Sequence, residues 1–543
     1  MAEQAAYSTE RLDHLGIVAG IGHEIELVER VDALVGEDGR KVSVGQSVLE
    51  MVLNGLGFVS RPLYLAPEFM AGKPVDILIG EGLTAEDFND DSLGRALDRL
   101  YEVGVTEVFA YVAAHAVAVM GIATDMVHLD STSFSLEGEY EFVEPDDQAI
   151  RVTYGYSRDH RPDLKQVVLS LICSHQSGIP TWLAALDGNA ADSSQFPKTV
   201  QTYVAQFKAG ENVPVIVADT ALYNADTVKE LEGVSWVTRV PASVSEVKDL
   251  YQTVSLEQMR SIGDGDYKAW TVESDYGGVA QRWVLVYSEG LYHREAASLQ
   301  RVIDKERDEV EKMLRRLNRR EYPTPEAARA AVETMAETWR FHTVQIEPHS
   351  IPKYRQRGRP SAEQLPDYHV WQPGAALVED SEAIDHAMHT KGKFVIATNV
   401  LDTQHLSDEV LVDTYKGQNA TVERGFRFLK DPLFFAHSLF LKKPKRIMAL
   451  LMVMGLCLLV YALAEHRLRS ELVSRDETLP DQTGKPTQCI TMRRVFQIFE
   501  GIDILLLTTD GGQQRLILNL SDLHHRILEM LGRHVRQCYF QFA

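Results

Sequence analysis

Three carboxylates in the sequence stand where they could hold a metal ion. The apolar runs VHLDST and VIVADT each reach an aspartate, Asp130 and Asp219, at the predicted end of a strand. A carboxylate at the end of a buried strand is costly to desolvate unless it is paired or binds a cation. Glu423 lies in the segment TVERGFRFLKDP (421–432), which predicts an amphipathic helix. This helix would supply a third carboxylate if it packs against the sheet.

Three oxygen donors from separate elements suit two hard cations such as Mg²⁺, with Mn²⁺ as a substitute. Two such ions activate a water or a 3′-hydroxyl and stabilise the leaving oxygen of an in-line phosphoryl displacement. Simpler interpretations stay open for each residue. Asp130 and Asp219 could cap the turns that follow their strands. Glu423 could form an ordinary surface pair with Arg427, four residues on, worth about a few tenths of a kcal/mol.

The helix at 421–432 has two distinct faces. Glu423, Arg427 and Lys430 fall within roughly 40° of one another around the helix axis. The opposite side carries the apolar residues Val422, Phe426 and Leu429. We therefore expect the apolar side to face a core, and the charged side to set a carboxylate beside two cations.

These motifs together resemble those of the DDE transposases of bacterial insertion sequences. The resemblance is to the group with a Tyr-Arg-Glu-Lys (YREK) signature, Tyr-x2-Arg-x3-Glu-x6-Lys. The matching stretch is YKGQNATVERGFRFLK, with Tyr415, Glu423 and Lys430, while HLDSTSF and VIVADTALYN resemble the family's two aspartate motifs. Two departures are visible: the spacing from Tyr415 to Glu423 is one residue longer, and Gln418 occupies the Arg position. Arg424 or Arg427 could supply the guanidinium instead, and Arg427 is favoured because it shares the face of Glu423 and Lys430.

The resemblance implies a fold, a reaction and its partners. It implies an α/β fold with an RNase H-like mixed sheet, flanking helices and an insertion between the second Asp and the Glu. It implies metal-dependent cleavage of DNA at element ends, followed by strand transfer of the 3′-hydroxyl. Its partners would be the terminal inverted repeats and target DNA, bound by a homodimer or a larger assembly. The residues that it points to are Asp130, Asp219 and Glu423 as catalytic metal ligands, and Tyr415, Arg427 and Lys430 as DNA contacts.

A separate basic segment, YRQRGRPS (354–361), contains Arg357-Gly358-Arg359-Pro360. This core resembles sequences that place arginines in a narrow A·T minor groove, so Arg357 and Arg359 are further candidates for DNA binding. An exposed basic loop is the simpler interpretation. His128 is expected on the same strand face as Asp130, where a packed or hydrogen-bonding role is favoured over metal binding.

Hydrophobic periodicity predicts five regions along the chain. Residues 9–120 read as helices, and strands follow at 125–136, 149–157, 166–174, 179–188 and before Asp219, with a helix around 195–209. Charged helices are expected near 296–320 and 326–340, a core strand at 393–400 and a helix at 408–417. The predicted regions are an N-terminal helical domain (1–122) for DNA-end binding or assembly, a first part of the catalytic core (123–240), an insertion (241–390), a second part of the core (391–470) and a C-terminal accessory region (471–543).

The net charge of −23 counts weakly against a nucleic-acid ligand. Its distribution matters more, because residues 1–150 hold 28 acidic and only 8 basic side chains. The remaining 393 residues hold 50 acidic and 47 basic side chains, including the basic clusters at 315–320 and 442–446. A polyanion is therefore expected to contact the downstream part of the chain.

The run IMALLMVMGLCLLVYALA (447–464) has 18 residues without a charge, the length of a membrane-span candidate. A helix that is apolar all round also fits the centre of a large domain, and we favour this interpretation, without a membrane. The four cysteines form no C-x-x-C pair, and no secretory signal is visible. The expected location is the cytoplasm of a bacterium, at the nucleoid when bound to DNA.

Two rival functions remain. A phosphohydrolase of the haloacid dehalogenase type would use Asp130 as nucleophile, but such enzymes usually carry a second Asp two residues on, where this chain has Thr132. A DNA-binding protein derived from a transposase and no longer catalytic is the other. The three carboxylates argue against it without proving turnover.

Overall fold

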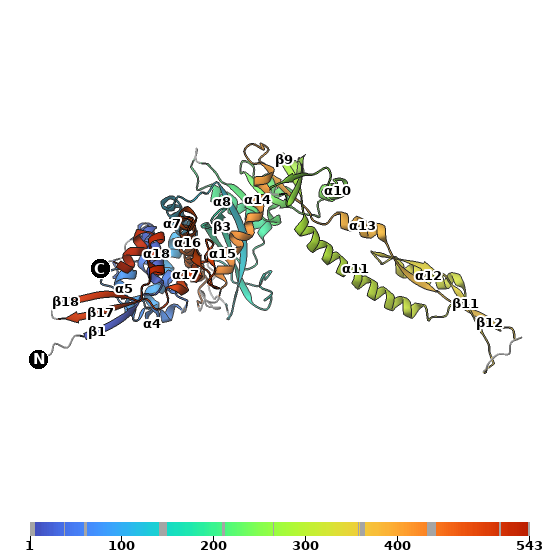
Figure 1. The fold of residues 1–543 in the computed structure, drawn as a ribbon, viewed down its shortest axis with the longest axis horizontal. Coiled ribbons are helices and arrows are strands. Elements are labelled where there is room, and N and C mark those ends of the chain that lie inside the picture. The colour runs from blue at the N-terminus through green and yellow to red at the C-terminus, as the bar shows by residue number, and fades with distance from the viewer. Residues whose placement is uncertain are drawn as a thin grey trace.

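A nine-stranded mixed sheet forms the centre of the computed structural model (Figure 1). The structure describes all residues except 1–5, 37–38, 59–61, 139, 141–148, 209–211, 264, 357, 359–363, 432–440, 510–511 and 541–543. In order across the sheet, the strands are β4 (Pro180–Leu186), β3 (Lys165–Ser174), β2 (Met126–Leu136), β5 (Val215–Ala218), β6 (Trp236–Val240), β14 (Lys393–Thr398), β9 (Gln281–Ser288), β8 (Tyr267–Ser274) and β7 (Arg260–Ile262).

The three central strands β2, β5 and β6 are parallel, and every other neighbouring pair is antiparallel. The parallel strands are joined through helices, while β2, β3 and β4 follow one another as antiparallel neighbours. The predicted α/β fold with a mixed sheet and flanking helices is confirmed. Of the predicted strands, 149–157 is wrong in the described chain, because it contributes only an isolated bridge between Thr153 and Gln166.

Helices cover both faces of the sheet, because side chains of successive strand residues point to opposite sides. On one face, α8 (Asp192–Val204), α9 (Ala225–Glu230) and α10 (Ser245–Thr253) pack on a core that includes Leu129 and Ala218. On the other face, α14 (Asp408–Lys416) packs through Leu411 and Val412 on Val217. The link η5 (Gly417–Ala420) then leads into α15 (Val422–Leu429).

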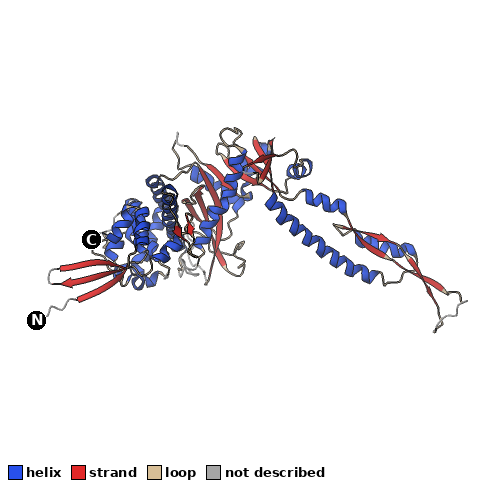
Figure 2. Ribbon diagram, viewed as in Figure 1, coloured by secondary structure: helices blue, strands red, loops and turns tan. Residues whose placement is uncertain are grey.

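The two ends of the chain build one helical body with a shared core (Figure 2). Its helices are α1 (Leu15–Glu24), α2 (Leu27–Val35), α3 (Val44–Leu56), α4 (Ala66–Met70), α5 (Val75–Leu78), α6 (Asp90–Val103), α7 (Val105–Met120), α16 (Pro444–Ser474), α17 (Met492–Ile498), α18 (Asp522–Leu531) and α19 (Arg533–Phe540). Beside it, β1 (Ala6–Arg11) pairs with β17 (Asp503–Thr509), which pairs with β18 (Gly512–Leu518). The expectation of helix from residue 9 is therefore wrong for residues 9–11, which belong to a strand.

The apolar run 447–464 lies inside α16, which packs against α1, α3, α6, α7 and α18. Among the described helices, α16 is long and apolar enough to cross a membrane, and the bent pair α6–α7 would pass the same test if it were one span. Within α16, 83% of the most apolar window is buried inside the protein. The prediction that this helix is buried in a core is confirmed.

A long arm leaves the sheet after β9 and returns at β14 (Figure 1). It contains α11 (Glu289–Leu317), α12 (Pro325–Ala336), β10 (His342–Ile346), β11 (His349–Lys353), β12 (Tyr368–Gln372), β13 (Ala375–Glu379) and α13 (Ser381–His389). A small core of its own joins Val310 and Leu314 of α11 to Val332 of α12 and Ile346 of β10. The strands β7, β8 and β9, also within 241–390, extend the central sheet.

Candidate active site

Asp130 and Asp219 lie side by side at the point where two parallel strands diverge. In the last residue pair between β2 and β5, Leu129 is opposite Ala218, so the two aspartates are the next residue of each strand. Asp219 follows the end of β5 as expected. Asp130 was expected at a strand end, but β2 continues to Leu136 in register with β3. Asp130 therefore lies within β2, at the level where the neighbouring strand β5 ends.

Burial perturbs both carboxyl groups. It raises the pKa of Asp130 to about 7, and the nearby charge of Asp219 adds to the increase. Burial also raises the pKa of Asp219, with Asp192 adding to the increase. Each group accepts one backbone hydrogen bond, at 2.7 Å from Ser131 N and 2.9 Å from Ala221 N. Two partly desolvated carboxyl groups this close favour sharing a proton or a cation.

Sequence reasoning missed two charged residues of this cluster, Arg158 and Asp192. Arg158 Nη1 lies 3.5 Å from Asp130 Oδ1, and Arg158 Nη2 donates to Asp192 and, at 3.1 Å, to Ser131 Oγ. The Ser131 hydroxyl also donates to Asp192. Asp192 is the first residue of α8, where an acidic residue is ordinary because it interacts favourably with the helix N-terminus. No spacing in the sequence distinguishes it from a structural residue.

The helix α15 presents the two faces predicted from its sequence. Val422, Phe426 and Leu429 are buried, while Glu423 and Arg427 are exposed. Lys430 caps the helix and donates to Asp159 Oδ1 at 2.7 Å. The described residues contain no group of three His, Cys, Asp or Glu side chains close enough to hold one metal ion. Of the three predicted carboxylates, Asp130 and Asp219 lie near each other, and Glu423 lies on the exposed face of α15.

Tyr415 of α14 is within electrostatic reach of both Asp219 and Glu423. Burial raises the pKa of its hydroxyl, and the charges of Asp219 and Glu423 raise it further. Arg239 of β6 is its hydrogen-bonding partner and acts in the opposite direction. Both carboxylates are therefore within electrostatic reach of the same phenol. Gln418, which occupies the Arg position of the YREK signature, is buried in η5.

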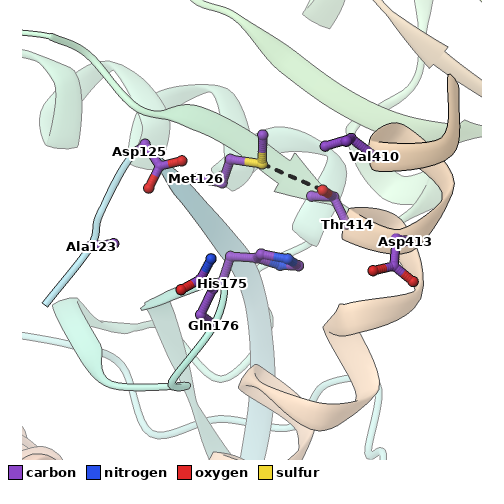
Figure 3. A pocket seen from close by; sticks show the side chains of 8 residues that line it. All are labelled: Ala123, Asp125, Met126, His175, Gln176, Val410, Asp413 and Thr414. Atoms are coloured by element: carbon purple, nitrogen blue, oxygen red, sulfur yellow. Dashed lines mark hydrogen bonds between the residues drawn. The ribbon is translucent and has the colours of Figure 1, made fainter. Parts of the chain in front are cut away.

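A histidine pair supports the link between α14 and α15. His128 is fully buried two residues before Asp130, and its Nε2 lies 2.8 Å from Nδ1 of His175. The predicted hydrogen-bonding role of His128 is confirmed, and burial lowers its pKa to about 3. His175 lines a pocket of about 280 Å³ between the start of β2 and α14, with Asp125 and Asp413 at its edges (Figure 3). A Cβ on Gly417 would lie 2.8 Å from the His175 ring, so the pair fixes where η5 can pass.

Two candidate DNA contacts, Arg357 and Arg359, lie outside the described residues. The strands β11 and β12 lie at the far end of the arm (Figure 1).

Comparison with known proteins decides the family. A family model described as a transposase DDE domain matches residues 124–460, more than half of the chain. The chain belongs to the DDE transposase family. Residues 7–114 match a second model, described as a domain of unknown function (DUF4277). No curated protein matches the chain.

Among solved structures, the chain is similar to a piggyBac transposase, seen in a cryo-EM synaptic complex with hairpin DNA. The identity is 9% and the TM-score 0.37, over 91% of this chain and 82% of that one. DDE transposases are phosphoryl-transfer enzymes of DNA transposition and typically use a divalent metal.

The donor set at Asp130 and Asp219 fits such an ion. Both groups offer carboxylate oxygens, the ligands that Mg²⁺ prefers, and burial leaves their negative charges poorly solvated. The only described cation that the structure places beside Asp130 is Arg158. A divalent ion would supply the charge compensation that the protein provides only in part.

Proposed function

We propose that this chain is an active transposase of the insertion-sequence YREK group. It would cleave DNA at the ends of its element and transfer the 3′-hydroxyl to target DNA. The observation that carries the proposal is that Asp130 and Asp219 directly follow the last parallel pair of β2 and β5, within electrostatic reach of each other, in a DDE-family domain. Asp219 caps the turn after β5 through its bond from Ala221 N, but two neighbouring carboxyl groups with raised pKa values are also typical of catalytic sites.

In this proposal, Asp130, Asp219 and Glu423 hold two Mg²⁺ ions, for which Mn²⁺ substitutes. When bound, the ions would activate the attacking oxygen and stabilise the leaving oxygen of the phosphodiester. Glu423 would join the aspartates when DNA binds, because its helix begins directly after η5 and contacts β2. Tyr415, on which the charges of Asp219 and Glu423 both act, would donate a hydrogen bond from its hydroxyl to a phosphate oxygen.

The exposed face of α15 would hold the DNA backbone. Arg427 is solvent-exposed and, within the described residues, makes no ion pair or hydrogen bond. It would replace the missing Arg of the signature. Lys430 would exchange its contact with Asp159 for a phosphate. Arg357 and Arg359 would contact a minor groove.

The partners in this proposal are double-stranded DNA carrying the terminal inverted repeats, and target DNA. Two ends must be held together, so a homodimer or a larger assembly would form on DNA. The helical region 1–122 would help to bind ends or to assemble the complex. The protein would act in the bacterial cytoplasm, at the nucleoid.

A cleavage assay tests the proposal directly. A labelled fragment with the element's own terminal repeats is incubated with the full chain in Mg²⁺, in EDTA, and with Glu423→Gln. We expect cutting at the repeat boundary that needs Mg²⁺ and is lost in Glu423→Gln. Cutting that persists in this variant would remove Glu423 from the site, and cutting in EDTA would overturn the metal requirement.

A second candidate is a DNA-binding protein of transposase descent without cleavage activity. It is favoured by one observation, that Glu423 lies exposed and does not form a three-carboxylate group with the aspartates in the described residues. Specific retention of the same fragment without cutting, in Mg²⁺ and in Mn²⁺, would support this candidate.

A further inference from the structure

An arginine-lined pocket of about 340 Å³ lies between α15, α16 and the chain around α17. Its arginines come from three different elements: Arg424 and Arg427 from α15, Arg469 from α16 and Arg493 from α17. Residues beyond 460 therefore contribute to it, although the transposase family model ends there.

Among the described residues that line the pocket, two carboxylates, Glu465 and Asp431, accompany the four guanidinium groups. Glu465 is almost fully buried and binds both Arg424, at 2.8 Å, and Arg469, at 3.1 Å. These two arginines are therefore fixed in place by one buried acid. The pocket keeps an excess of positive charge in a chain whose net charge is −23.

The other two arginines are open to a ligand. Arg493 Nη1 lies 3.1 Å from Asp431, but 43% of the Arg493 side chain is exposed. Its backbone N–H donates to the hydroxyl of Tyr461 at 3.0 Å, which anchors the start of α17 on α16. Arg427 is exposed and has no described ion-pair or hydrogen-bonding partner. A ligand could engage both guanidinium groups without displacing the buried pairs.

The lining chemistry selects among anions. Leu458, Ala462 and the ring of Phe428 form an apolar floor beside the arginines. Guanidinium groups bind phosphate in a bidentate, planar geometry, and the apolar floor beside them suits a phosphate ester with attached carbon atoms better than a small hydrated anion. Arg427 lies one helical turn, about 6 Å, beyond Glu423 on the same face of α15. A DNA strand that reaches Glu423 would thus pass this pocket.

We propose that this pocket binds a backbone phosphate of DNA through Arg427 and Arg493. The inference rests on the proposed function, and it assigns a DNA contact to the C-terminal region, outside the family's matched domain. The wall of the pocket is held in place by the ion pairs of Glu465 with Arg424 and Arg469. Asp431 competes with the phosphate for Arg493.

The test measures DNA binding without cleavage. The full chain binds a fluorescent 30-base-pair duplex of arbitrary sequence in EDTA, at several salt concentrations. We expect Arg493→Gln to weaken binding roughly 3- to 10-fold and to reduce the salt slope by about one, and Arg427→Gln to do the same. Arg475→Gln, an exposed arginine at the end of α16 that pairs with Glu471 and does not line the pocket, is the matched control and should change neither quantity.

Asp431→Asn separates binding from folding. If Arg493 contacts DNA, Asp431→Asn releases the guanidinium of Arg493 and tightens DNA binding. If Arg493 has a purely structural role, Asp431→Asn weakens DNA binding or leaves it unchanged. Unaltered affinity and slope in Arg493→Gln would overturn the proposal. Inorganic phosphate that raises the Tm of the wild type but not of Arg493→Gln, with DNA binding unaltered, would make this a free-phosphate site. If the wild type does not cleave DNA but the variants change DNA binding as expected, only the proposed function is refuted, and the phosphate contact stands.

Discussion

The guanidinium of Arg158 lies 3.5 Å from Oδ1 of Asp130 and at the same time binds Asp192. A positive charge therefore stands at the edge where the two aspartates of the DDE-family domain meet. It lowers the pKa of Asp130 against the larger opposing effect of burial. In the absence of a divalent ion, the site is an incompletely neutralised cluster of acids, and this has a measurable consequence for stability.

Asp130→Asn should stabilise the metal-free protein, because it removes a carboxylate whose ionised form burial disfavours. The folded-state pKa of about 7 lies above the ordinary value of 3.8, so ionisation near pH 7.5 costs stability. We expect a gain of about 1–2 kcal/mol, seen as a higher Tm in EDTA at pH 7.5. Mg²⁺ should raise the Tm of the wild type and leave that of the variant unchanged.

Asp187→Asn is the matched control, since Asp187 is a more exposed aspartate on the same sheet, paired with Arg151 at 3.6 Å. It should alter neither the Tm in EDTA nor the response to Mg²⁺ appreciably. A lower Tm for Asp130→Asn in EDTA would mean that the bond to Arg158 outweighs the cost of burying the charge.

Asp159→Asn should strengthen DNA binding by releasing Lys430, whose Nζ lies 2.7 Å from Asp159 Oδ1. The pair is partly exposed, so its own contribution to stability is small. We expect DNA affinity to rise roughly 2- to 5-fold at low salt and the salt slope to become steeper. Binding of a labelled duplex in EDTA measures both quantities.

Lys430→Gln should produce the opposite change in affinity and slope. If Asp159→Asn leaves DNA binding unaltered while Lys430→Gln weakens it, Lys430 contacts DNA without competition from Asp159. If neither variant alters binding, the lysine only caps α15.

The local elements around the site could be predicted because their patterns are short-range. The apolar positions Val422, Phe426 and Leu429 repeat at helical spacing, and burial follows from that spacing alone. Likewise, VIVA before Asp219 is a short apolar run between turns, and it forms the buried strand β5. The fold class follows from the order of such elements.

The rest depends on contacts between distant parts of the chain. The polar run Ser131, Thr132, Ser133 argues locally for a strand end, yet β2 continues through it, because Ser131 bonds Asp192 and Ser133 Oγ accepts from Arg158 N. Residues 6–11 form a strand only because β17, almost five hundred residues later, pairs with them. Neither partner is visible from the neighbouring sequence.

Asp408→Asn should destabilise the sheet strongly, because Asp408 is a buried acid that neutralises two arginines. It binds Arg282 and Arg260 and accepts from Thr271 Oγ1 at 2.6 Å, tying α14 to strands β7, β8 and β9. Losing the charge leaves the buried Arg282 uncompensated, so we expect a loss of about 3–5 kcal/mol in the free energy of unfolding. Glu409→Gln, the exposed neighbour on α14, should cost less than about 0.5 kcal/mol in the same urea titration. Similar losses in the free energy of unfolding for both variants would show that the buried pairs of Asp408 make no special contribution to stability.

Glu50→Gln should remove a pH dependence that is built into the helical body. Glu50 of α3 is fully buried, and neither of its carboxyl oxygens has a hydrogen-bonding partner among the residues that the structure describes.

Burial raises the pKa of Glu50 from 4.5 to about 8, so between these values the folded chain keeps a proton that the unfolded chain has lost. The free energy of unfolding of the wild type must therefore fall as pH rises through this window, by up to about 1.4 kcal/mol per pH unit. The glutamine variant lacks this proton, so its urea midpoint should decline less between pH 5 and pH 8, whereas Glu81→Gln, at an exposed site, should follow the wild type. Parallel curves for wild type and Glu50→Gln would mean that Glu50 is ionised in the folded protein, with its charge balanced by Lys73, the cation that lowers its pKa.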